Sequence, residues 1–190
     1  MKRLFILSIL LCVTFFSSAQ ENNPQSASVE QSLWSAQATL FGLWITNEAR
    51  LSDEVALRSQ VGLSGGYTQT YATDYSFLYM LIPEIELESR WYHSIDRRAS
   101  KGRNTANNSA DYVSLKSTYQ PDWFTIGNDH KEDIFSSLAL TANAGMRREI
   151  WTNFSFELAT GLGVAYDLEN VNQKDFFVFP DFHFNLGYSF

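Results

Sequence analysis

The last residues of the chain alternate between large apolar side chains and polar or small ones. The apolar positions are Phe182, Phe184, Leu186, Tyr188 and Phe190, and between them lie Asp181, His183, Asn185, Gly187 and Ser189. A period of two places successive side chains on opposite faces of a β-strand. The pattern therefore predicts a strand with one face suited to hydrocarbon and the other suited to a polar interior.

The same period recurs along most of the chain after residue 32. It is clear in the segments 55–64, 77–91, 113–119, 137–147 and 153–166. The segment from Leu33 to Thr46 is apolar on both faces and less regular, so we expect a sharp bend within it. With the last segment these make seven strands, whereas bacterial single-chain barrels have an even number. We therefore predict eight strands, with one hidden before Asn47 or between Pro121 and Asp133.

This alternation favours an all-β fold, a closed antiparallel transmembrane β-barrel, over a soluble sheet. In hydrocarbon every backbone amide needs a partner, and strands achieve this only in a closed sheet. Aromatic residues near the expected strand ends would form girdles at the two membrane interfaces. They are Trp34, Trp44, Tyr67, Trp91, Tyr119, Trp151, Tyr166 and Tyr188. A soluble β-sandwich or lipocalin-like barrel is the alternative, because it would alternate as well.

The first 19 residues have the three parts of a secretory signal peptide. Met1-Lys2-Arg3 is basic, Leu4 to Phe16 is almost entirely apolar, and Ser17-Ser18-Ala19 offers small residues for cleavage after Ala19. The apolar run is shorter than the roughly 20 residues that a membrane-spanning helix needs. We therefore predict a signal peptide over residues 1–19, a flexible lead-in over 20–32 and a barrel over 33–190.

Composition and charge narrow the possible partners. The chain is 45% hydrophobic and 18% charged, which indicates a folded protein. Loss of Lys2 and Arg3 with the signal peptide takes the formal net charge from −7 to −9, so nucleic acid is not an expected partner. Cys12 is the single cysteine of the sequence and lies in the predicted signal peptide, so we expect no disulfide in the mature chain.

The signal peptide ending in Ser-Ser-Ala-Gln and the final strand from Phe182 to Phe190 resemble those of small outer-membrane β-barrel proteins of Gram-negative bacteria, particularly uncharacterised ones of the Bacteroidota type. Arg90-Trp91-Tyr92, Arg97-Arg98, Lys101-Gly102 and the run from Asn104 to Ser109 resemble a block that recurs in such proteins. The resemblance implies an outer-membrane location. It implies that the membrane lipids, lipopolysaccharide and periplasmic chaperones are partners. It also implies that the barrel-assembly machinery is a partner, which would recognise the terminal motif of Phe182, Phe184, Leu186, Tyr188 and Phe190.

Charged residues cluster on the face that a barrel would turn inward. Glu84, Glu86, Glu88 and Arg90 share one face of a predicted strand, and Arg58, Lys116 and Arg147 are inward by the same parity. Carboxylates in a narrow interior need partners, so one interpretation is a paired polar core. The other is a charged lining that binds a ligand or selects solutes. The candidate lining residues are Glu84, Glu86, Glu88, Arg90, Arg58, Glu157 and His183.

We predict a porin-like outer-membrane protein with a structural, adhesive or small-solute role, without catalysis, cofactor or metal. One alternative is a lipid-modifying hydrolase. Its candidate catalytic residues are Ser155, Glu157 and His183, which are predicted to point to the same face of neighbouring strands. Another is a soluble periplasmic ligand-binding barrel. The run from Asp96 to Arg103 is the basic cluster of the chain, and we interpret it as a solvated loop or a contact for anionic lipid headgroups.

Overall fold

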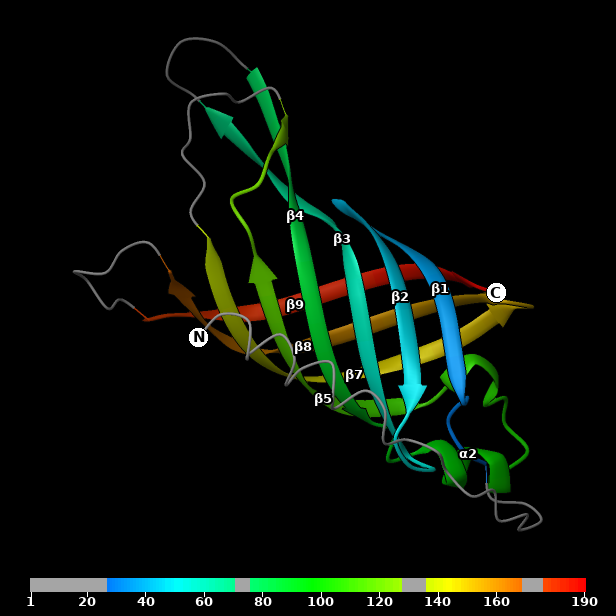
Figure 1. Ribbon diagram of the computed structural model, residues 1–190. Helices are drawn as coiled ribbons and strands as arrows, with labels where there is room; N and C mark the ends of the chain where they lie inside the picture. Colours follow the sequence, from blue (N-terminus) through cyan, green and yellow to red (C-terminus); the bar gives the residue numbers. More distant parts are fainter. Residues whose placement is uncertain (1–26, 71–75, 128–135, 169–175) are drawn as a thin grey trace, which may run out of the picture.

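The computed structural model describes residues 27–70, 76–127, 136–168 and 176–190. The elements in these ranges are β1 (Ser32–Thr39), β2 (Gly42–Arg50), β3 (Val55–Thr70), β4 (Ser76–Trp91), α2 (Ile95–Ser100), the 3-10 turn η1 (Ala106–Asn108), β5 (Asp111–Gln120), β6 (Ile126–Gly127), β7 (Ser137–Trp151), β8 (Phe154–Asp167) and β9 (Phe176–Ser189). Neighbouring strands are antiparallel, β1 pairs with β9, and β3 pairs with β4. Eight strands therefore close into a barrel (Figure 1), and β6 is a short addition to the edge of β4.

The prediction of eight strands is confirmed, and the hidden strand lies before Asn47. The segment from Leu33 to Thr46 lies in a hairpin with Leu40 and Phe41 at its tip. Its strands β1 and β2 pair from Thr39↔Gly42, next to the tip, to Ser32↔Ala49. The alternative position, between Pro121 and Asp133, contains only the two residues of β6 in its described part. The expected bend is thus a complete reversal of the chain.

The polarity of the barrel is inverted relative to a soluble protein. Among the described residues, eighteen polar or charged side chains are buried against nine hydrophobic ones. The apolar positions of the last strand, such as Phe182, Leu186 and Tyr188, are exposed on the outer surface, and Asn185 and Ser189 on the opposite face are buried. The predicted alternation therefore describes an apolar outside and a polar inside.

One of the expected girdle residues is placed differently. Trp44 is 7% exposed and lies on the inner wall of the barrel, so its assignment to an interface girdle is wrong. The reason is the hairpin: β2 begins at Gly42, and Trp44 shares its inward face with Thr46 and Glu48. Tyr67 is an expected girdle residue whose side chain lies outside the described part of the structure.

The two ends of the barrel differ. The start of β1, the end of β9, the turns at 51–54 and 152–153, and the connection from β4 to β5 that carries α2 and η1 lie at one end (Figure 1). There Ile95 and Tyr92 are fully buried, so this connection covers the end, which we call the closed end. The hairpin tip at 40–41 and the connection carrying β6 lie at the other, open end.

The predicted signal peptide lies outside the described residues. Of the predicted lead-in, residues 27–32 are described: Val29 is fully buried at the closed end, and its backbone N–H donates to the carbonyl of Asp53. The boundaries predicted at residues 19 and 32 stay predictions. Within the described ranges, no helix is long and apolar enough to cross a membrane.

Candidate functional site

A cluster of fully buried ion pairs fills the barrel next to the closed end. The carboxylate of Glu157, on β8, accepts hydrogen bonds from Arg58 on β3 at 3.0 Å, from Arg90 on β4 at 2.7 and 2.8 Å, and from the hydroxyl of Tyr112 on β5 at 3.0 Å. The Arg90 contact is bidentate, which is the strongest geometry for an arginine and a carboxylate. Four strands are thereby tied together through one side chain.

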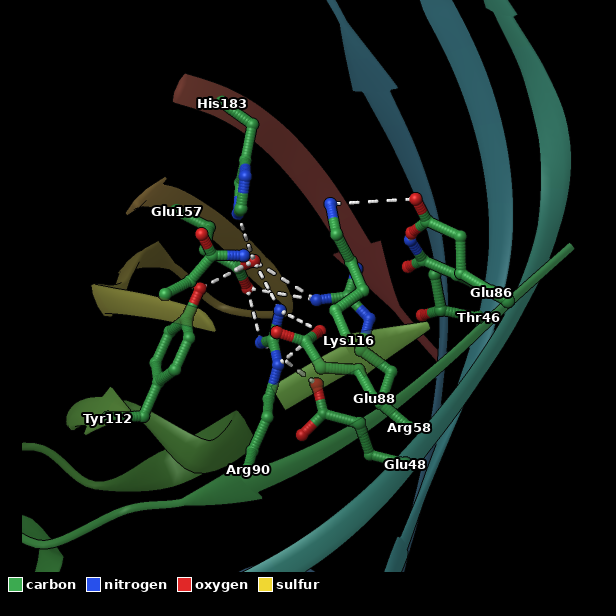
Figure 2. Close-up of polar contacts among 12 residues, drawn as sticks. Thr46, Glu48, Arg58, Glu86, Glu88, Arg90, Tyr112, Lys116, Glu157 and His183 are labelled. Atoms are coloured by element: carbon green, nitrogen blue, oxygen red, sulfur yellow. Dashed lines mark hydrogen bonds and ion pairs between the residues drawn. The ribbon is translucent and has the colours of Figure 1, made fainter. Parts of the chain in front are cut away.

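Arg90 is the centre of this cluster. Besides Glu157 it contacts Glu88 at 2.8 Å and Glu48 at 3.7 Å, and its guanidinium lies 4.2 Å from the centre of the Tyr112 ring. Figure 2 shows the guanidinium of Arg90 between the three carboxylates. A buried charge is stable only when it is paired and hydrogen-bonded. Here Arg90 pairs with Glu88 along β4 and with Glu157 and Glu48 on other strands.

The strand register also places opposite charges side by side on adjacent strands. Arg58 lies directly opposite Glu88, Lys116 opposite Glu88, and Arg147 opposite Glu157. Facing residues of opposite charge stabilise neighbouring strands. Gly145 makes room for this arrangement, because a Cβ there would lie 2.6 Å from the ring of Tyr112.

A second group of contacts joins the cluster to the closed end. Glu48, on β2, accepts hydrogen bonds from Arg147, from the hydroxyl of Tyr92 at 2.7 Å and from the amide of Asn108 at 2.8 Å. Burial and the nearby Glu48 carboxylate raise the pKa of Tyr92, so its hydroxyl stays protonated and donates. The side-chain oxygen Oδ1 of Asn108 in turn accepts a hydrogen bond from the backbone N–H of Glu30 at 2.7 Å. The β4–β5 connection and the segment before β1 are therefore anchored to the interior.

Above the cluster, the barrel holds a cavity of about 560 Å³ that reaches the open end. Lys116 contributes the ammonium group of its wall, which lies 3.2 Å from Asp181 and 3.5 Å from Glu86. Thr118 donates a hydrogen bond to Glu86 at 2.9 Å, and His183 lies beside Asp181, with 3.7 Å between Nδ1 and the carboxylate. The cavity has the size of a small-molecule site and a mixed lining of charged and aromatic residues.

The seven candidate lining residues all lie on the inner wall. The structure divides them into two groups: Arg58, Glu88, Arg90 and Glu157 belong to the ion cluster, and Glu84, Glu86 and His183 line the cavity above it. Arg58, Glu88 and Arg90 also form the floor of the cavity. A ligand for these residues stays a prediction.

Several residues of the site were not among the candidates. Asp181 stands on the polar face of the last strand, so its parity could have identified it. Glu48 was hidden by the unrecognised hairpin. Tyr92 and Asn108 belong to the block that carries the family resemblance, and the structure assigns that block to closing one end of the barrel.

The candidate hydrolase set is not assembled as a triad. His183 Nε2 lies 3.8 Å from Glu157, but that carboxylate is held by two arginines. His183 faces Ala159 on β8, and Ser155 lies four residues before Ala159, which is about 13 Å away at the rise of a strand. Among the described residues, no group of three His, Cys, Asp or Glu side chains could hold a metal ion.

Comparison of the sequence with protein-family models and with curated proteins gives no match. What the protein does must therefore be inferred from its own geometry.

Proposed function

We propose that this protein is an outer-membrane β-barrel that holds a small solute in a cavity open to the cell exterior and carries out no catalysis. The observation that carries the proposal is the inverted polarity of the barrel: its buried side chains are mainly polar, and its outer surface is covered with large apolar residues. Such a surface would be unstable in water and is what a lipid bilayer requires.

Aromatic residues support the placement in a membrane. Trp34 at the start of β1, Trp91 at the end of β4 and Trp151 at the end of β7 are all exposed and lie toward the closed end. Tryptophan in such a ring marks the interface between hydrocarbon and water. A soluble periplasmic barrel, the alternative, would have no use for this ring or for the apolar surface beyond it.

Chain direction supports the orientation. An even number of strands leaves both ends of the barrel chain on one side, here the closed end. A chain that is exported by a signal peptide and inserted from the periplasm keeps these ends in the periplasm. The closed end then faces the periplasm, and the cavity faces the outside, toward the lipopolysaccharide.

The interior supports solute binding in preference to conduction. Eight-stranded barrels are narrow enough for side chains to fill them. The ion cluster and the β4–β5 connection fill the periplasmic half, whereas the outer half keeps the cavity. A purely structural or adhesive barrel would not need that cavity.

Single cysteines on the inner wall test this orientation, because the mature chain is predicted to contain no other. Ala139 lines the cavity, whereas Ala159 also faces inward but is packed in the closed half. We expect a membrane-impermeant maleimide to label Ala139→Cys in intact cells and to leave the matched variant Ala159→Cys unlabelled. Labelling of Ala139→Cys only after the outer membrane is permeabilised would overturn the proposed orientation.

A further inference from the structure

The barrel wall is incomplete above the β1–β2 hairpin. β1 pairs with β9 over four positions only, from Ser35 to Ala38, while β9 continues ten residues beyond Leu186 to Phe176. On the other side, β3 pairs with β2 as far as Ser64 and continues to Thr70. Figure 1 shows β3 and β4 rising beyond the hairpin. Among the described residues, no strand fills the space between the upper parts of β3 and β9.

The cavity extends into this gap. Its wall includes Leu40 and Phe41 at the hairpin tip, and also Phe182 and Phe184 of β9. The last two face the outside of the barrel, since they alternate with the inward Asp181, His183 and Asn185. Outward side chains can border an internal cavity only where the wall is open. We call this gap, bordered by Leu40, Phe41, Phe182 and Phe184, the lateral opening.

The rim of the lateral opening is apolar. Leu40 is 78% exposed and Phe182 is 74% exposed, although hairpin tips in water usually carry Gly, Asn or Asp. Exposed apolar residues continue toward the open end on β8 and β9, at Leu162, Val164 and Val178. The lateral opening therefore lies within the apolar band of the barrel, at the level of lipid chains.

The inner end of the cavity has the opposite character. Glu86 and Asp181 contact the ammonium group of Lys116. Glu84 lines the same cavity and has no ion-pair partner among the described residues. Glu88 and Asn185 also line the cavity, and Oε1 of Glu88 and Oδ1 of Asn185 make no hydrogen bond within the described structure. Both side chains are more than nine-tenths buried. Counted with Glu88, four carboxylates line the cavity, against the three cations Arg58, Arg90 and Lys116. The site therefore carries an excess of one negative charge and holds acceptor oxygens that lack a donor.

We propose that the cavity binds a single-chain amphiphile with an amine headgroup, which enters from the outer leaflet through the lateral opening. An ammonium group supplies a positive charge and three donors for the unpaired oxygens. The alkyl chain lies against Leu40, Phe41 and Phe182 and continues into the bilayer. This inference rests on the proposed membrane location, and it names the chemical class of the solute.

Spin labels in vesicles separate the two proposals. We introduce Phe41→Cys at the lateral opening and, as a control, Leu140→Cys on the outer surface of β7. Both labels should be reached by oxygen and be protected from a water-soluble nickel complex. A Leu140→Cys label exposed to nickel would overturn the membrane location itself. A Leu140→Cys label in hydrocarbon with a Phe41→Cys label in water would overturn the lateral opening alone.

A photoreactive dodecylamine tests the headgroup. In nanodiscs containing the mature protein, it should label the peptides of residues 39–44 and 176–186 about tenfold more than a dodecyl sulfate with the same photoreactive group, as the loss of one charged contact predicts. Glu84→Gln should remove most of this preference, while Glu54→Gln, at a turn outside the cavity, should keep it. Equal labelling by the two probes in the unaltered protein would overturn the amine assignment.

Discussion

Replacing Glu157 by alanine should destabilise the barrel by about 3–5 kcal/mol, the usual cost of removing one partner of a buried ion pair. Glu157 is 2% exposed and is the shared partner of Arg58 and Arg90. Its loss leaves two guanidinium groups, each only 1% exposed, without their main carboxylate. The hydroxyl of Tyr112 loses its acceptor as well.

Urea titration of the refolded protein in lipid vesicles, followed by tryptophan fluorescence, measures this change in the free energy of unfolding. Asp96→Ala, which removes an exposed carboxylate in α2, is the control and should change the free energy of unfolding by less than about 0.5 kcal/mol. Glu157→Gln should lie between the two, because it keeps an acceptor oxygen and loses the charge. A Glu157→Ala variant as stable as the control would show that the ion cluster does not support the fold.

Replacing Leu115 by arginine should destabilise the membrane-inserted protein by about 2–4 kcal/mol, the cost of an arginine on the lipid face near the bilayer centre. Leu115 lies in the middle of β5, is 54% exposed and points outward. In a soluble barrel the same position would face water, and the substitution would be nearly neutral. The sign and size of the effect therefore distinguish the two environments.

The same vesicle titration applies, with Thr152→Arg as the control. Thr152 lies in the turn between β7 and β8 at the closed end, is exposed, and would meet water or headgroups in either environment. If Leu115→Arg unfolds at the same urea concentration as Thr152→Arg, the outer surface of β5 does not face hydrocarbon.

Most of the barrel could be predicted from the sequence because a period of two determines which side chains share a face. The inward positions of Arg58, Glu84 and His183 follow directly from this rule. The rule failed at the first hairpin, where the tip is Leu40-Phe41 in place of a turn motif such as Asn-Gly, so two strands resembled one irregular strand. The error also turned Trp44 toward the wrong side.

The contacts inside the barrel could not be predicted, because they depend on how the sheet closes. Arg58 and Glu157 are 99 residues apart, and Asn108 reaches Glu48 only because the β4–β5 connection folds back over the end of the barrel. The lateral opening likewise exists because β1 and β9 pair over only a few residues. Alternation along one strand contains no information on any of these distances.

The most direct test of the central claim is the gel mobility of the refolded mature chain, unheated and boiled, combined with fractionation of cells that express it. A closed membrane barrel resists detergent until it is heated. We predict a shift in mobility on boiling and recovery of the protein in the outer-membrane fraction. Identical mobility in both samples, with the protein in the soluble fraction, would contradict the membrane location and make Leu115 and Phe182 part of a water-exposed surface.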